Sequence, residues 1–124
     1  MFPWKRFHVL TTVGTGAYSS AVFRRRRFAD VVSRQLDLFA REEAGLIADC
    51  EKAERAYDRA ARDEAEERYG DYLDLVETAT ELLAELRDNF AATLDADAAE
   101  EYEAAFNHAV LKRFPRFALE IEDT

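Results

Sequence analysis

Mostly apolar residues recur at alternating steps of three and four from residue 36 to residue 64, which is the spacing of one face of an α-helix. The positions are Leu36, Phe39, Glu43, Leu46, Cys50, Ala53, Tyr57, Ala60 and Glu64. Phe28 and Val32 extend this heptad-type seam backwards at steps of four. The pattern predicts one long helix over residues 24–69. Two acids, Glu43 and Glu64, stand on the seam itself, and we expect such acids to set helix register rather than to bind metal.

Two shorter helices are predicted after a one-residue slip in phase near Gly70. We expect Gly70 to end the long helix in a left-handed conformation and Asp71 to cap the next helix, over residues 71–93. The apolar face of that second helix is Tyr72, Leu75, Ala79, Leu82, Leu86 and Phe90. The capping-box spacing from Asp97 to Glu100 opens a third helix over 97–114, which Pro115 stops. Its apolar face is Tyr102, Phe106, Ala109, Val110 and Phe114.

The predicted fold class is therefore all-α: an antiparallel helical bundle or coiled-coil hairpin with one long helix and two shorter ones. Residues 1–20 form an irregular or extended N-terminal arm, because Phe7, Val9, Thr11 and Val13 alternate with polar residues. Residues 21–114 form the bundle, and residues 115–124 form an irregular or extended C-terminal tail. The alternation from Phe117 to Glu122 would also suit packing in a groove or addition as a strand.

The lengths of these helices predict an exposed apolar surface. A helix over 24–69 is about twice as long as either partner, so its first half would be left uncovered. That half carries the bulkiest apolar residues, and we expect it to form a homodimer interface. The interface residues would be Val31, Val32, Leu36, Phe39, Leu46 and Ile47. The alternative is a kink near Gly45 that folds the helix over and removes the need for a partner.

Charge is distributed unevenly along the 124 residues. The chain holds 17 Lys+Arg and 26 Asp+Glu, a formal net charge of −9. The first 34 residues are nevertheless basic, and they include a candidate anion or lipid contact made of Lys5, Arg6, Arg24, Arg25, Arg26 and Arg27. This cluster leaves two alternative functions open: a membrane-peripheral or membrane-complex accessory protein that uses residues 1–27, and a nucleic-acid-binding protein that uses Arg24–Arg27. Nucleic acid is the less favoured partner, because the acidic remainder of the chain would repel a polyanion.

Residues that could carry chemistry are few. The single cysteine, Cys50, lies on the seam and is expected to be a small core residue. His108 lacks the Glu three positions before it that a di-iron bundle needs, and His8 lies outside the helices. The loop from Val13 to Ser20 lacks the Gly-Lys-Ser/Thr of a phosphate-binding loop. We therefore expect no enzyme activity, no cofactor and no metal.

These observations together predict a non-enzymatic helical protein that mediates protein–protein interaction or assembly. Its expected partner is protein, most simply a second copy of the chain, with contact to a membrane surface left open. The stretch from Phe7 to Phe23 is too diluted by polar residues to be a clear transmembrane span. The expected compartment is the cytoplasm, with membrane association as the alternative.

Overall fold

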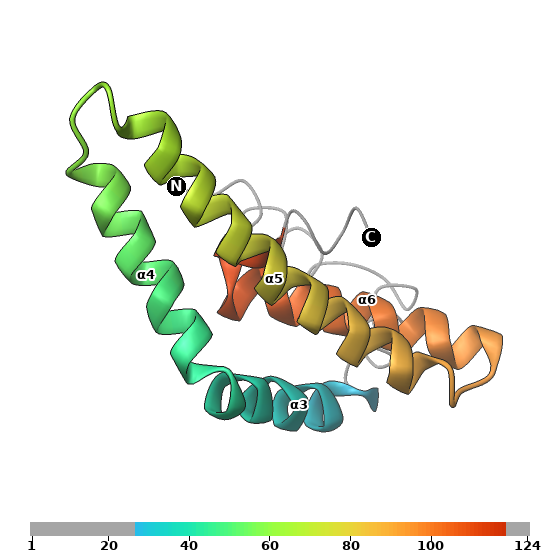
Figure 1. The fold of residues 1–124 in the computed structure, drawn as a ribbon. Helices are drawn as coiled ribbons and strands as arrows, with labels where there is room; N and C mark the ends of the chain where they lie inside the picture. Colours follow the sequence, from blue (N-terminus) through green and yellow to red (C-terminus); the bar gives the residue numbers. More distant parts are fainter. Residues whose placement is uncertain (1–26, 119–124) are drawn as a thin grey trace, which may run out of the picture.

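The computed structural model describes residues 27–118, and all regular structure in this part of the chain is helical. The all-α prediction is thus confirmed for these residues. Figure 1 shows the helices in chain order, followed by a helical turn at 115–118. They are α3 (Ala29–Glu42), α4 (Ala44–Asp58), α5 (Ala65–Ala91) and α6 (Ala96–Arg113). The predicted extended arm of residues 1–20 lies outside the described residues.

The helices pack in sequence order, and α3 closes back onto the last helix. α4 and α5 form an antiparallel hairpin, and α5 and α6 form a second one, so that α5 contacts a different neighbour with each of its halves (Figure 1). The chain bends sharply between α3 and α4, and this bend brings α3 against α6. At 27 residues α5 is about 40 Å long and forms the central element of the fold.

The predicted helix over 24–69 is not continuous. It is interrupted at Glu43, whose φ of −109° and ψ of 28° are not helical, and it ends at Asp58. The glycine two residues later, Gly45, is a weak helix former, which lowers the cost of a bend here. Packing favours the bend as well: Phe39, just before it, contacts the rings of Phe114 and Phe117 at centroid distances of 5.5 and 6.4 Å.

The predicted break at Gly70 is also wrong, because α5 begins at Ala65 and runs through this glycine. The chain turns earlier, over residues 59–64, through hydrogen bonds from Ala60 N–H to the Tyr57 carbonyl and from Glu64 N–H to the Ala61 carbonyl. No described residue has a positive φ, so this turn needs no glycine. The slip in the phase of the apolar seam indicates that the helix is interrupted somewhere before Tyr72. The interruption is the turn at residues 59–64, and Gly70 does not cause it.

The third predicted helix is placed correctly within two residues. Its cap is Asp95 rather than Asp97: the Asp95 carboxylate accepts a hydrogen bond from the Ala98 N–H at 2.8 Å. At the other end Phe114 follows the last helical residue, and Pro115 begins the turn at 115–118. Proline suits the first position of a helical turn because its missing N–H would have no partner there. The first four residues of the predicted extended tail are therefore helical; the remainder lies outside the described residues.

The core lies where α3, α5 and α6 meet, and α4 contributes little to it. The largest side chains with less than 2% exposure are Tyr102, Phe106, Phe117, Leu36, Leu83, Val110 and Cys50. Cys50 is the only buried residue of α4, which agrees with the prediction that it is a small core residue. Phe117 projects from the turn at 115–118 onto Phe39 of α3, so the chain beyond α6 helps to hold the bend.

Candidate functional site

The residues predicted to form a self-association surface are largely covered within the chain. Val32, Leu36 and Phe39 are buried in the core with 2%, 1% and 5% exposure. The other three, Val31, Leu46 and Ile47, are half-buried and pack against that core. The bend at Glu43 is the reason, because it turns α3 onto α6 instead of leaving it exposed. Within the described chain, three of the six predicted interface residues thus lie inside the fold and three at its edge, as the alternative with a kink near Gly45 expects.

Of the predicted anion- or lipid-contacting residues, only Arg27 lies in the described part of the chain. Its Nη1 donates to Glu101 Oε2 at 3.3 Å, and its guanidinium lies 5.1 Å from the centre of the Phe28 ring. Arg27 thus ties the start of α3 to α6 through an acid of the same chain. Lys5, Arg6, Arg24, Arg25 and Arg26 lie outside the described residues.

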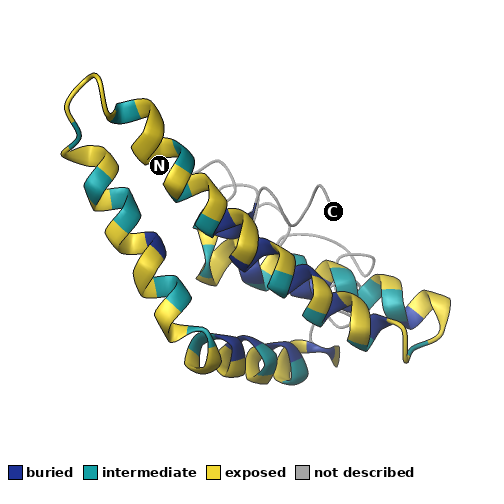
Figure 2. Cartoon of the chain, in the orientation of Figure 1, coloured by how far each residue is buried: buried dark blue, intermediate teal, exposed yellow. Residues whose placement is uncertain are grey.

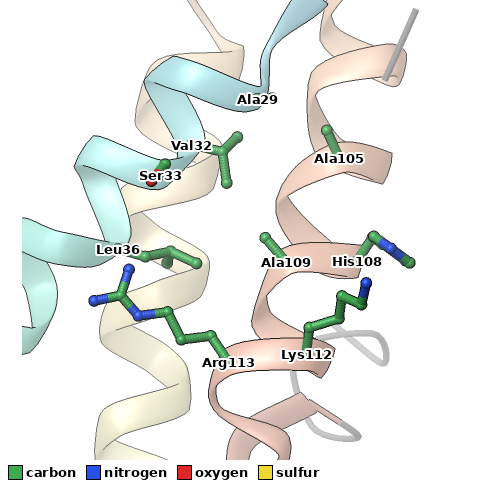
Figure 3. A pocket seen from close by; sticks show the side chains of 9 residues that line it. All are labelled: Ala29, Val32, Ser33, Leu36, Ala105, His108, Ala109, Lys112 and Arg113. Atoms are coloured by element: carbon green, nitrogen blue, oxygen red, sulfur yellow. The ribbon is translucent and has the colours of Figure 1, made fainter. Parts of the chain in front are cut away.

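A groove of about 330 Å³ runs between α3 and α6 and is called here the α3–α6 groove. Its floor is apolar and consists of small and branched side chains from both helices, with cationic groups along α6 (Figure 3). The lining residues are Ala29, Val32, Ser33, Leu36, Ala105, His108, Ala109, Lys112 and Arg113. The small side chains of Ala29, Ser33, Ala105 and Ala109 are what leave this space between the two helices.

Two basic side chains of α6, Lys112 and Arg113, line one end of the α3–α6 groove. Arg113 reaches across from α6 toward α3 (Figure 3), where its Nη1 lies 2.6 Å from Asp37 Oδ1. Lys112 lies beside Arg113 in the lining of the groove.

A second surface is formed by residues 51–75 of α4 and α5, called here the projecting hairpin, of which Tyr72 and Leu75 are half-buried and pack against the core. None of its residues is buried, as Figure 2 shows by the absence of dark blue from this end of the two helices. Tyr57, Tyr69 and Leu73 are 40%, 45% and 39% exposed, and they are three of the five large apolar residues that stand exposed in the described chain. The Tyr69 ring contacts Tyr57 and Tyr72 at centroid distances of 5.2 and 6.4 Å.

The projecting hairpin is held mainly by small residues. Ala53 and Ala56 of α4 face Leu75 of α5, where the two helices leave a hollow of about 320 Å³. The rim of this hollow alternates in charge, with Asp49, Lys52, Arg68 and Asp71 around it. Because the opposite charges neutralise one another, the hollow has no charge preference for a ligand. At its base the hairpin is joined to the core by the hydrogen bond from Arg116 Nη2 to Glu54 Oε1.

Tyr102 and Arg87, two polar side chains buried in the core, have hydrogen-bond partners, whereas the buried Thr80 Oγ1 has none among the described residues. The Tyr102 hydroxyl donates to Gln35 Oε1 at 2.7 Å, and burial raises the pKa of Tyr102 to about 12. Arg87, 5% exposed, donates to Asn107 Oδ1 at 3.0 Å and to Asp88 Oδ1 at 2.8 Å. Burial also raises the pKa of the Cys50 thiol, although the Arg116 guanidinium opposes the shift. A raised pKa leaves Cys50 in its unreactive thiol form at neutral pH.

No group of three or more His, Cys, Asp or Glu side chains among residues 27–118 is arranged to hold a metal ion. None of the helices in that range is both long and apolar enough to cross a lipid bilayer. Comparison of the chain with family models, curated proteins and solved structures found no match.

Sequence reasoning missed both the α3–α6 groove and the projecting hairpin. The hairpin had a signal: Tyr69 and Leu73 are four residues apart, outside the apolar faces assigned to the first two helices. The groove had none, because Ala29, Ser33, Ala105 and Ala109 become one surface only after α3 turns back onto α6.

Proposed function

We propose that this chain is a non-enzymatic helical protein that mediates protein–protein interaction and associates with itself. The observation that supports the proposal most directly is the projecting hairpin, 25 residues with no buried side chain but with three large exposed ones. Apart from Tyr72 and Leu75, which pack against the core, the side chains of this hairpin gain little from packing, and helices in water are stabilised mainly by packing one face. A partner that covers Tyr69 and Leu73 would supply that packing.

The chemistry of this surface is typical of protein interfaces. Tyrosine is enriched among the residues that contribute most to binding, because it presents a large rigid area and loses little conformational entropy. Tyr57, Tyr69 and Tyr72 already contact one another, so their rings are partly ordered before any partner binds. Binding to a surface that is ordered beforehand costs less entropy than binding to a mobile one.

The test is the oligomeric state of the full chain, measured by sedimentation equilibrium at about 50 μM. A dimer with a dissociation constant of about 1 μM, which corresponds to a binding free energy of about 8 kcal/mol, would be the main species at this concentration. We expect a dimer for the wild type and mostly monomer for Tyr69→Ala and Leu73→Ala. Alanine is a good helix former, so both variants should keep the helical circular dichroism of the wild type.

Leu111→Ala is the matched control, because Leu111 is 49% exposed on α6 and belongs to neither the groove lining nor the projecting hairpin. It should leave the dimer intact. A wild-type chain that stays monomeric at about 50 μM, or variants at Tyr69 and Leu73 that dimerise as the wild type does, would contradict the proposed self-association.

A further inference from the structure

We propose that the N-terminal arm of one copy, residues 1–20, docks on the exposed tyrosines of the projecting hairpin of a second copy, and that the same contact in the opposite direction gives a two-fold dimer. This inference rests on the self-association proposed above and names the segment that covers Tyr69 and Leu73. Each copy carries one arm and one hairpin, so both contacts form together and the assembly closes.

The first argument is the chemistry of the surface to be covered, which is apolar at its centre and acidic at its edge. The Tyr57 and Tyr69 rings contact each other across the hairpin, and Leu73 follows Tyr69 by four residues, so the three side chains form one face, called here the tyrosine face. Glu66 lies three residues before Tyr69 and Glu77 four residues after Leu73, and both acids are exposed. The tyrosine face therefore suits a partner that is both apolar and cationic.

An acid beside the tyrosine face already pairs with an arginine from a distant part of the chain. Glu54, three residues before Tyr57, accepts a hydrogen bond from Arg116 Nη2 in the turn at 115–118. At the other end of the described chain, Arg27 pairs in the same way with Glu101 of α6 at 3.3 Å. Contacts between a guanidinium and a carboxylate thus already join segments of this chain that are far apart in sequence.

The second argument is that charge selects the N-terminal segment from the surfaces that a second copy offers. Residues 27–118 hold 12 basic and 23 acidic side chains, and residues 119–124 add three acids and no base. Two tyrosine faces set against each other would bring Glu66 and Glu77 of one copy toward those of the other, and like charges across an interface disfavour it. Residues 1–26, in contrast, hold five basic side chains and no acidic one.

The third argument is that the arm combines its cations with aromatic rings. Phe2, Trp4 and Phe7 alternate with Lys5 and Arg6 within a single short stretch. Aromatic rings pack favourably against tyrosine rings, and lysine or arginine is attracted to the face of such a ring. The residues from Phe2 to Phe7 therefore supply both of the properties that the tyrosine face requires.

The experiment is a charge exchange between the arm and the tyrosine face, followed by sedimentation velocity of the full chain. The arm variant is K5E/R6E and the hairpin variant is E66K/E77K. We expect each variant alone to dimerise at least about tenfold more weakly than the wild type, because like charges then meet at both contacts of the dimer. An equimolar mixture of the two should form a heterodimer with affinity near that of the wild type, since each contact then joins opposite charges.

The matched control is R34E/R41E, which changes the net charge as much as the arm variant does. Arg34 and Arg41 are exposed on α3 and belong to neither the arm nor the projecting hairpin. This control should dimerise as the wild type does. Salt should weaken the wild-type dimer, because the acids at the edge of the tyrosine face are exposed to solvent.

Trp4 gives a second measurement that needs no change of charge, because it is the single tryptophan of the chain. Docking moves its ring from water onto an apolar surface, so its fluorescence emission should shift to shorter wavelength as the protein concentration rises through the dimerisation range. Leu73→Ala should abolish this dependence on concentration, and Leu111→Ala should retain it.

The possible failures separate the two proposals. A wild type that is monomeric at about 50 μM contradicts both the self-association and the docking of the arm. If the wild type is a dimer but K5E/R6E dimerises equally well, or if the mixture of the two charge variants does not recover dimerisation, then self-association stands and the docking of the arm is wrong. Emission from Trp4 that is the same at every concentration would also contradict docking on a second copy.

Discussion

Among residues 27–118, Tyr102 has the largest fully buried side chain, and its hydroxyl group donates to Gln35 Oε1. Tyr102→Phe keeps the ring and removes the hydrogen bond. We expect the free energy of unfolding at pH 7 to fall by about 1 kcal/mol, the usual net contribution of one such bond. Urea denaturation followed by circular dichroism measures the difference. A change of several kcal/mol would show that the phenylalanine variant repacks the core rather than deleting one bond.

The same substitution predicts a pH dependence. The pKa of Tyr102 is raised from 10.0 to about 12 in the folded chain, so the folded state keeps a proton that the unfolded chain releases above pH 10. The free energy of unfolding that this group contributes therefore falls as pH rises from about 10 to about 12, by as much as about 2–3 kcal/mol. Tyr102→Phe lacks the group, so its stability deficit of about 1 kcal/mol should shrink and then reverse over this range; parallel curves for the two proteins would contradict the shift.

Single residues also show why some of the fold was predictable. The apolar positions of the third helix, among them Tyr102, Phe106 and Val110, are buried as their spacing indicates, because a helix with one apolar face must turn that face inward. The seam acids Glu43 and Glu64 were expected to set register within one long helix. Each instead is the residue that precedes a helix, Glu43 before α4 and Glu64 before α5.

At the scale of elements, Gly70 tests where α5 begins. Gly70 lies inside the helix, and a Cβ added there would meet no atom within 4 Å. Gly70→Ala should therefore raise the free energy of unfolding by about 0.5–1 kcal/mol, since alanine is the better helix former. Thermal unfolding measures the shift. If Gly70 were instead a left-handed residue after a helix, the same substitution would lower the melting temperature.

The start of α6 offers a matched pair of variants. Asp95→Ala removes the side chain that accepts from the Ala98 N–H and should cost about 1 kcal/mol. Asp97→Ala, in the first turn of the same helix, loses only the interaction of a charge with the helix dipole, worth a few tenths of a kcal/mol. Chemical denaturation of the two variants should show the larger loss for Asp95. Equal losses would mean that the cap contributes no more than its charge.

The elements were predicted with unequal success for a physical reason. The third helix has strong signals at both ends, since Pro115 cannot continue it and acids cluster where it begins. The boundary between α4 and α5 has none, because residues 59–64 turn without glycine or proline. The bend at Glu43 is set by tertiary packing of Phe39 against Phe114 and Phe117, which local spacing does not encode.

At the scale of the whole molecule, the buried side chains of residues 27–118 are concentrated at one end of the fold. Residues 51–75 contain no buried side chain, whereas the second half of α5 and most of α6 are built around the core. We expect amides of the projecting hairpin to exchange with solvent through local opening, at lower free energy than amides of 76–91 and 102–110. Hydrogen–deuterium exchange measured by mass spectrometry, at low and high protein concentration, tests this expectation.

The dependence of amide protection on protein concentration distinguishes a hairpin that contacts a second copy from one that is stable alone. If the projecting hairpin is the contact between copies, its protection should rise with protein concentration while that of residues 102–110 stays the same. A hairpin as protected as the core at every concentration would show that it is stable without a partner.

The turn at residues 59–64, at the far end of the projecting hairpin, has a practical consequence. It joins α4 to α5 away from the buried side chains, so extra residues there would leave every core contact in register. Doubling the length of such a connection costs only about 0.6 kcal/mol in closure entropy. A short Gly-Ser insertion between Arg62 and Asp63 should therefore be accepted with little loss in melting temperature, which makes this turn the natural point for attaching a reporter or tether.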